Sequence, residues 1–72
     1  MLLDLRKYKL AKILKRDLTD LIKKMDQCEE LLKPYVLYSA ASGILNQLRI
    51  EKGLVKYHLE KQEMIIKMKG QQ

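Results

Sequence analysis

The feature that most constrains the fold is a long segment, residues 3–32, that contains neither glycine nor proline. Within it, apolar residues recur at alternating steps of four and three, the a/d pattern of a helix that packs along one side. The residues of this predicted packing seam are Leu14, Leu18, Leu21, Met25, Cys28 and Leu32. The segment ends at Lys33-Pro34, because proline has no amide hydrogen and pushes the residue before it out of the helical region. We therefore predict one helix over about 3–32, with Cys28 as a small buried residue.

A second helical segment follows and runs to about residue 69. Pro34 suits the first turn of a helix that begins directly after it. Alternatively, Ser39 or Ser42 can act as an N-cap, which would leave the residues just after Pro34 as a loop. We predict a turn over about 33–38 and a second helix over about 39–69.

Two glycines, Gly43 and Gly53, lie inside the second segment. Each costs a helix about 1 kcal/mol relative to alanine, so a break near either glycine stays open. The small residues of 39–43 favour either the close approach of another helix or a mobile loop.

The short connection makes the two helices antiparallel neighbours. A chain of 72 residues with 47% hydrophobic residues has much to bury and little length in which to bury it. The single cysteine cannot form an internal disulfide, so oligomerisation is the remaining way to complete the core. We predict an all-α fold: a single helical-hairpin domain over 1–72 that completes a coiled-coil-like four-helix bundle by dimerisation.

The second segment has apolar residues on two sides. One stripe consists of Leu37, Ala41, Ile44, Leu48, Val55, Leu59 and Ile66. The other, which we call the second stripe, consists of Val36, Ala40, Gly43, Gln47, Ile50, Leu54, Tyr57, Lys61, Met64 and Met68. At 100° per residue the two lie on nearly opposite sides of a helix, and one partner helix covers only one of them.

The second stripe is therefore the predicted contact surface, because an uncovered apolar strip of this length is unusual on a soluble monomer. A homo-oligomer, with a dimer favoured, is the leading interpretation. A different protein as partner and a monomer with an exposed strip are the alternatives. The predicted oligomer or partner contacts are Ile50, Leu54, Tyr57, Met64 and Met68.

Fifteen Lys and Arg against nine Asp and Glu give a net charge of +6, which favours acidic partners. The basic residues that gather on one side of the first helix are Lys9, Lys12, Arg16 and Lys23. They can serve as phosphate contacts of a nucleic-acid-binding protein, or simply as a solvated face, which the nearby Asp17 and Asp20 favour. The sequence has no aromatic platform or base-reading motif, so nucleic-acid binding would be mainly electrostatic.

The sequence contains no pattern that indicates catalysis, a metal or a cofactor. His58 and Cys28 are the only residues of their types and lie on different helices, so they make no ligand set. Charges at positions 4, 6, 7 and 9 leave no apolar segment for a signal peptide, and no stretch is long enough to span a membrane. The basic amphipathic N-terminus makes membrane binding a minor alternative. We expect a cytoplasmic, non-enzymatic protein–protein interaction module with no cofactor; the alternative is a nucleic-acid-binding accessory protein.

Overall fold

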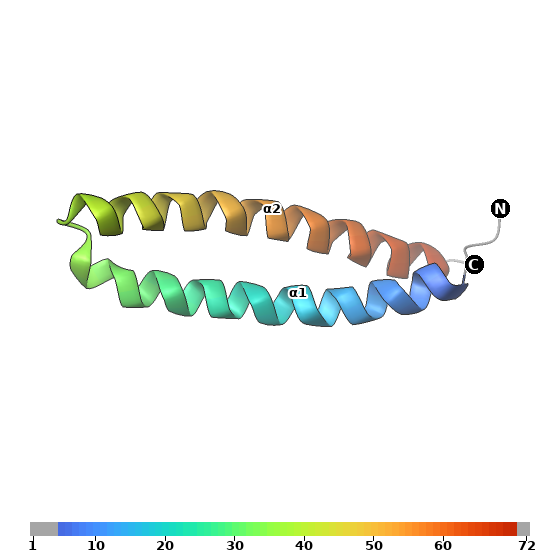
Figure 1. Ribbon diagram of the computed structural model, residues 1–72. Coiled ribbons are helices and arrows are strands. Elements are labelled where there is room, and N and C mark those ends of the chain that lie inside the picture. Colours follow the sequence, from blue (N-terminus) through green and yellow to red (C-terminus); the bar gives the residue numbers. More distant parts are fainter. Residues whose placement is uncertain (1–4, 71–72) are drawn as a thin grey trace.

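A computed structural model of the chain describes residues 5–70 and is an antiparallel helical hairpin (Figure 1). Helix α1 spans Leu5–Leu32, a short 3-10 turn, η1, spans Lys33–Tyr35, and helix α2 spans Ser39–Gly70. The hairpin is a rod with extents of 53 × 16 × 16 Å. The predicted all-helical hairpin is confirmed, although the predicted helical residues 3 and 4 lie outside the described part of the chain.

The turn between the helices is built around Pro34, which stands at the start of η1, where a missing amide hydrogen leaves no helical bond unmade. The amide of Tyr38 then donates a hydrogen bond to the carbonyl of Tyr35 (3.0 Å). The carbonyl of Tyr38 accepts the amide of Ser42 (3.0 Å), which closes the first turn of α2. The second helix therefore begins at Ser39 and not directly after the proline.

Helix α2 continues without a break through Gly43 and Gly53. Both have negative φ angles, as an ordinary helical residue does. A break near either glycine and a mobile loop over 39–43 are therefore both wrong. No heavy atom of a neighbouring part of the hairpin lies within 4 Å of the place where a β-carbon would stand at either glycine.

Helix α1 packs on α2 through a seam that is turned slightly from the predicted one. Ala11 and Met25 are buried. The half-buried residues that recur with them at helical spacing are Tyr8, Leu14, Leu18, Ile22, Glu29 and Leu32. The prediction was right for Leu14, Leu18, Met25 and Leu32. It was wrong for Leu21 and Cys28, which are exposed because Ile22 and Glu29 take their places beside α2.

Helix α2 buries Leu45, a residue that the sequence pattern did not single out. The half-buried residues along the same side are Ala41, Leu48, Lys52, Val55, Leu59, Gln62, Ile66 and Lys69. Two members of the predicted stripe, Leu37 and Ile44, are exposed instead. Several places in the seam thus hold long polar side chains, while leucines and isoleucines stand outside it.

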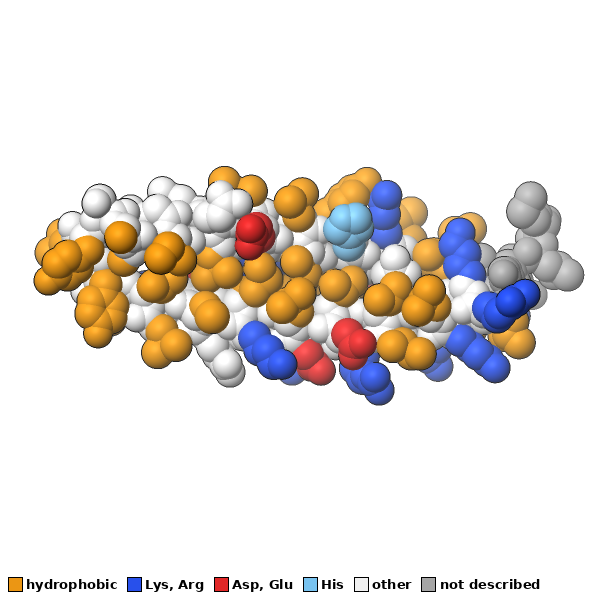
Figure 2. Space-filling model, viewed as in Figure 1, with side chains coloured by type: hydrophobic (Ala, Val, Ile, Leu, Met, Phe, Trp, Pro, Cys, Tyr) orange, Lys and Arg blue, Asp and Glu red, His pale blue; other side chains and the backbone are white. Residues whose placement is uncertain are grey.

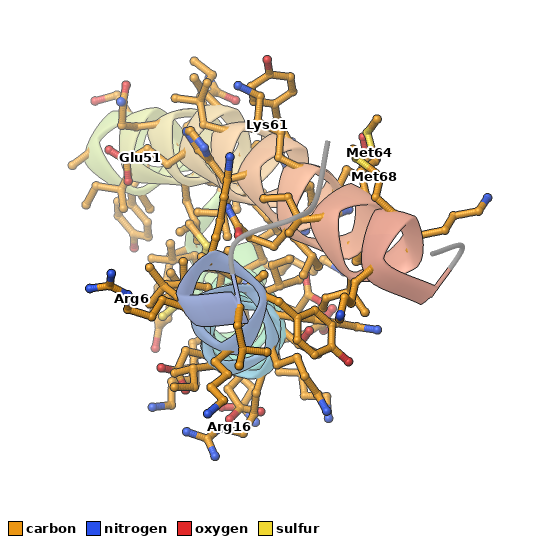
Figure 3. The ribbon with its side chains drawn as sticks, turned by 90° about the vertical axis from the view of Figure 1, so that its right-hand side faces the viewer. Arg6, Arg16, Glu51, Lys61, Met64 and Met68 are labelled. Carbon is orange, nitrogen blue, oxygen red and sulfur yellow. The ribbon has the colours of Figure 1, made fainter. Side chains whose placement is uncertain are left out.

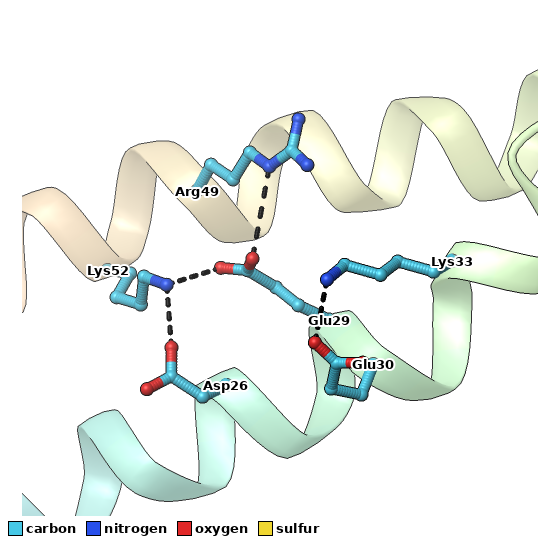
Figure 4. Close-up of polar contacts among 6 residues, drawn as sticks. All are labelled: Asp26, Glu29, Glu30, Lys33, Arg49 and Lys52. Atoms are coloured by element: carbon cyan, nitrogen blue, oxygen red, sulfur yellow. Dashed lines mark hydrogen bonds and ion pairs between the residues drawn. The ribbon is translucent and has the colours of Figure 1, made fainter.

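A cluster of ion pairs joins the two helices where the seam is polar (Figure 4). Nζ of Lys52 in α2 lies 2.6 Å from Oδ1 of Asp26 and 2.6 Å from Oε1 of Glu29, both in α1. Nε of Arg49 lies 3.9 Å from the other carboxylate oxygen of Glu29. The side chains of Lys52 and Glu29 are only 17% and 14% exposed, so the pair sits between the helices and fixes their register.

Candidate interaction surface

The second stripe of α2 is not covered by α1. Ile50, Leu54, Tyr57, Met64 and Met68 are each more than half exposed. Figure 3 shows Met64 and Met68 on the side of α2 away from α1, while Arg16 points from α1 in the opposite direction. The predicted contact residues therefore lie together on one helix and open to solvent.

Helix α1 also exposes apolar residues: Leu21, which the sequence pattern placed in the packing seam, and others that belong to no predicted surface. Leu10, Ile13 and Leu31 are about half exposed or more, and Leu21 is 41% exposed. Asp26 marks the side of α1 that carries the interhelical ion pairs. Measured from Asp26 across the seam, at about 100° per residue, Leu21 and Leu10 lie at about 140° and 160°, whereas Leu31 lies at about 220°. Leu10 and Leu21 therefore lie together on the other side of the seam, and Leu31 lies on the back of α1.

The apolar residues of the two helices meet on this other side. In α2 the ion-pair side is marked by Arg49. Measured from Arg49 across the seam, Ile44 lies at about 140° and Leu54 at about 220°, whereas Met68 lies at about 260°, on the side of α2 away from α1. We call the surface on this other side of the seam the shared apolar face; its exposed residues are Leu10 and Leu21 of α1 and Ile44 and Leu54 of α2. In Figure 2, hydrophobic side chains follow the line where the two helices meet along most of the rod, with charged side chains at the margins.

Polar residues within the second stripe are held by their neighbours. Nζ of Lys61 lies over the ring of Tyr57, 4.8 Å from its centroid, which is within range of a cation–π interaction. The side-chain amide of Gln47 donates to Oε1 of Glu51 (3.3 Å). These contacts place polar groups at fixed positions along an otherwise apolar strip.

The four predicted phosphate contacts, Lys9, Lys12, Arg16 and Lys23, are all exposed on α1. They lie on the side of the rod that carries Asp26, away from the shared apolar face. Nε of Arg16 lies 3.4 Å from Oδ1 of Asp17, and Nζ of Lys12 lies 5.6 Å from the centroid of the Tyr8 ring. The hairpin is thus two-sided, with an apolar surface on one side and a charged surface on the other.

The exposed area is large for a chain of this size. The chain exposes 5877 Å², whereas a compact monomer of 8.5 kDa exposes about 4,700 Å². The difference, roughly 1,200 Å², exceeds the about 800 Å² that each partner contributes to a standard stable interface. Among the described residues only Ala11, Met25 and Leu45 are buried. Two helices alone leave this core open.

Over residues 5–70, no group of three His, Cys, Asp or Glu side chains is placed so that it could hold a metal ion. Neither helix contains, within its described part, a stretch long and apolar enough to cross a membrane. Comparisons of the chain with protein-family models, with curated proteins and with solved structures found no match.

Proposed function

We propose that the chain is a non-catalytic protein–protein interaction module, such as a small regulator, adaptor or assembly subunit, that acts as a helical homo-oligomer. The observation that carries the proposal is the exposure of Ile50, Leu54, Tyr57, Met64 and Met68 on one side of α2. Apolar area left in water is unfavourable by about 25 cal/mol per Å². A long exposed apolar strip is therefore typical of a surface that another chain covers.

The chemistry of this strip suits a protein partner. Two of its members, Met64 and Met68, are flexible thioethers that adapt to the shape of the chain that covers them. The Lys61 ammonium over Tyr57 places one positive charge within the strip. Such a polar position favours one orientation of a partner over others, at some cost in affinity.

The test is the oligomeric state of the native chain and of Leu54→Asp, measured by sedimentation over a range of concentrations. We expect the native chain to sediment as an oligomer. Leu54→Asp should shift toward the monomer, because it introduces a charge into the apolar contact. Lys67→Gln lowers the net charge by the same amount at an exposed position on the charged side of α2 and should behave like the native chain. A native chain that stays monomeric at high micromolar concentration, with normal helicity, would contradict the proposal.

The exposed basic residues support one alternative, a nucleic-acid-binding accessory protein that contacts phosphates without reading bases. The double variant Lys12→Glu, Arg16→Glu separates the two functions. Binding to RNA or DNA that falls steeply with salt and is lost in this variant would favour the alternative. Under the leading proposal the variant oligomerises normally and neither protein binds nucleic acid at physiological salt.

A further inference from the structure

We infer that two copies of the hairpin pair head to tail through the shared apolar face, so that the start of α1 in one copy lies beside the η1 turn of the other. This rests on the proposed function, and it names both the occupant of the surface and its orientation. The surface involved extends beyond the second stripe, because it includes the exposed leucines of α1.

The apolar residues of the two helices are centred at about the same level of the rod. The Lys52–Asp26 ion pair sets the register of the antiparallel helices. Counting five residues from that pair along each helix places Leu21 of α1 level with Tyr57 of α2. Leu21 lies near the middle between Leu10 and Cys28, which share one angle around α1, and Tyr57 lies near the middle of the second stripe. A two-fold axis across the rod at this level, which gives head-to-tail pairing, or one along the rod, which gives pairing in the same direction, therefore places the apolar residues of one copy against those of the other.

The uneven distribution of charge along the rod favours the head-to-tail orientation. The half of the rod that contains the start of α1 and the end of α2, residues 5–18 and 59–70, has nine Lys or Arg and three Asp or Glu. The half that contains the turn, residues 19–58, has six basic and five acidic residues. Side-by-side pairing in the same direction would place two strongly basic halves within a Debye length of each other. Head-to-tail pairing places each basic half beside a nearly neutral one.

The area that the hairpin leaves exposed is large enough for a second copy to cover. The hairpin exposes roughly 1,200 Å² more than a compact monomer of its mass, against the about 800 Å² per partner of a standard interface. A second identical rod matches the length of the uncovered face from end to end. Two-fold pairing is also the commonest form of homo-oligomer.

The native cysteine measures the orientation directly. Cys28 is exposed at the margin of the shared apolar face, seven residues from the Leu21 level. With a rise of 1.5 Å per residue and helices about 10 Å apart, two spin labels at Cys28 should lie about 20–25 Å apart in the head-to-tail pair. Pairing in the same direction would bring them to about 10 Å. Sedimentation of the labelled protein shows whether the label leaves the oligomer intact.

A disulfide experiment gives an independent answer without a label. One variant carries Leu10→Cys in a Cys28→Ser background, and a second, affinity-tagged chain keeps the native Cys28, which is exposed at the same angle of α1. After mixing and mild oxidation, head-to-tail pairing should favour the mixed disulfide several-fold over the two homodisulfides. Dominant homodisulfides, or a short Cys28–Cys28 distance, would overturn the orientation while leaving the homo-oligomer in place. A monomeric native chain would overturn both, as would a native chain that associates only with an anionic vesicle or a different protein.

Discussion

Lys52 of α2 and Asp26 of α1 form a short ion pair across the hairpin, with Nζ 2.6 Å from Oδ1. The hydrogen bond from Lys52 lowers the pKa of Asp26 below its ordinary value of 3.8. The hydrogen bonds to Asp26 and then Glu29 raise the pKa of Lys52 above its ordinary value of 10.5. The ion pair therefore links the two helices throughout the pH range between 3.8 and 10.5.

The first prediction concerns pH. The lowered pKa of Asp26 gives stability that is present above its ordinary value and lost as the pH falls through the lowered one. The raised pKa of Lys52 gives stability that is present below its ordinary value and lost as the pH rises through the raised one. We expect the melting temperature, followed by circular dichroism, to fall once the pH drops below the ordinary Asp value of 3.8 and once it rises above the ordinary Lys value of 10.5. Asp26→Asn should weaken the acid-side change; an unchanged acid profile in this variant would contradict the assignment.

The second prediction concerns the polar seam. Lys52→Met should lower the melting temperature, because it leaves Glu29 without its nearest cation between the helices. The double variant Glu29→Leu, Lys52→Leu replaces the pair with apolar side chains and should melt at least as high as the native chain. A double variant that is less stable than the native chain would show that the ion pair contributes net stability.

The third prediction concerns Gly53. Alanine at this helical position meets nothing within 4 Å and should stabilise the helix by about 1 kcal/mol. For a chain of this size, that gain corresponds to a melting temperature about 4–8 °C higher. Gly43→Ala is the matched comparison, since it also meets open space within the hairpin. A smaller gain at Gly43, which belongs to the second stripe, would indicate that another helix approaches it closely in the oligomer.

The fourth prediction tests whether α1 contributes to association. Leu21→Asp should weaken association at least about 30-fold, the effect expected for a central interface position that loses about 2 kcal/mol. The measurement is sedimentation over a concentration series, with helicity followed in parallel. Lys23→Gln changes the net charge equally on the opposite side of α1 and is the control. If Leu54→Asp disrupts the oligomer and Leu21→Asp does not, the contact involves α2 alone.

The hairpin itself was predictable from local features. Pro34 can only stand at a helix start or in a turn, and the apolar spacing on both sides of it is helical. The unbroken course of α2 was not predictable, because a glycine in a helix costs too little to decide between a continuous and a broken helix.

The packing seam of α1 could be predicted only in part. The pattern favoured Leu21 and Cys28 because they are apolar at suitable spacing, yet Ile22 and the charged Glu29 face α2 instead. Glu29 is acceptable there because Lys52 from the other helix meets it. A single helical segment does not reveal such a partner. For the same reason Leu21 was assigned to the core, and the shared apolar face was missed.

The antiparallel course has one practical consequence for anyone who engineers the chain. Helix α1 begins and helix α2 ends at the same end of the rod (Figure 1). A fluorescent protein or affinity handle fused after Gly70 would therefore emerge beside the first turn of α1, far from the Pro34 bend. That bend is the place to graft a short reporter peptide when both ends are already occupied.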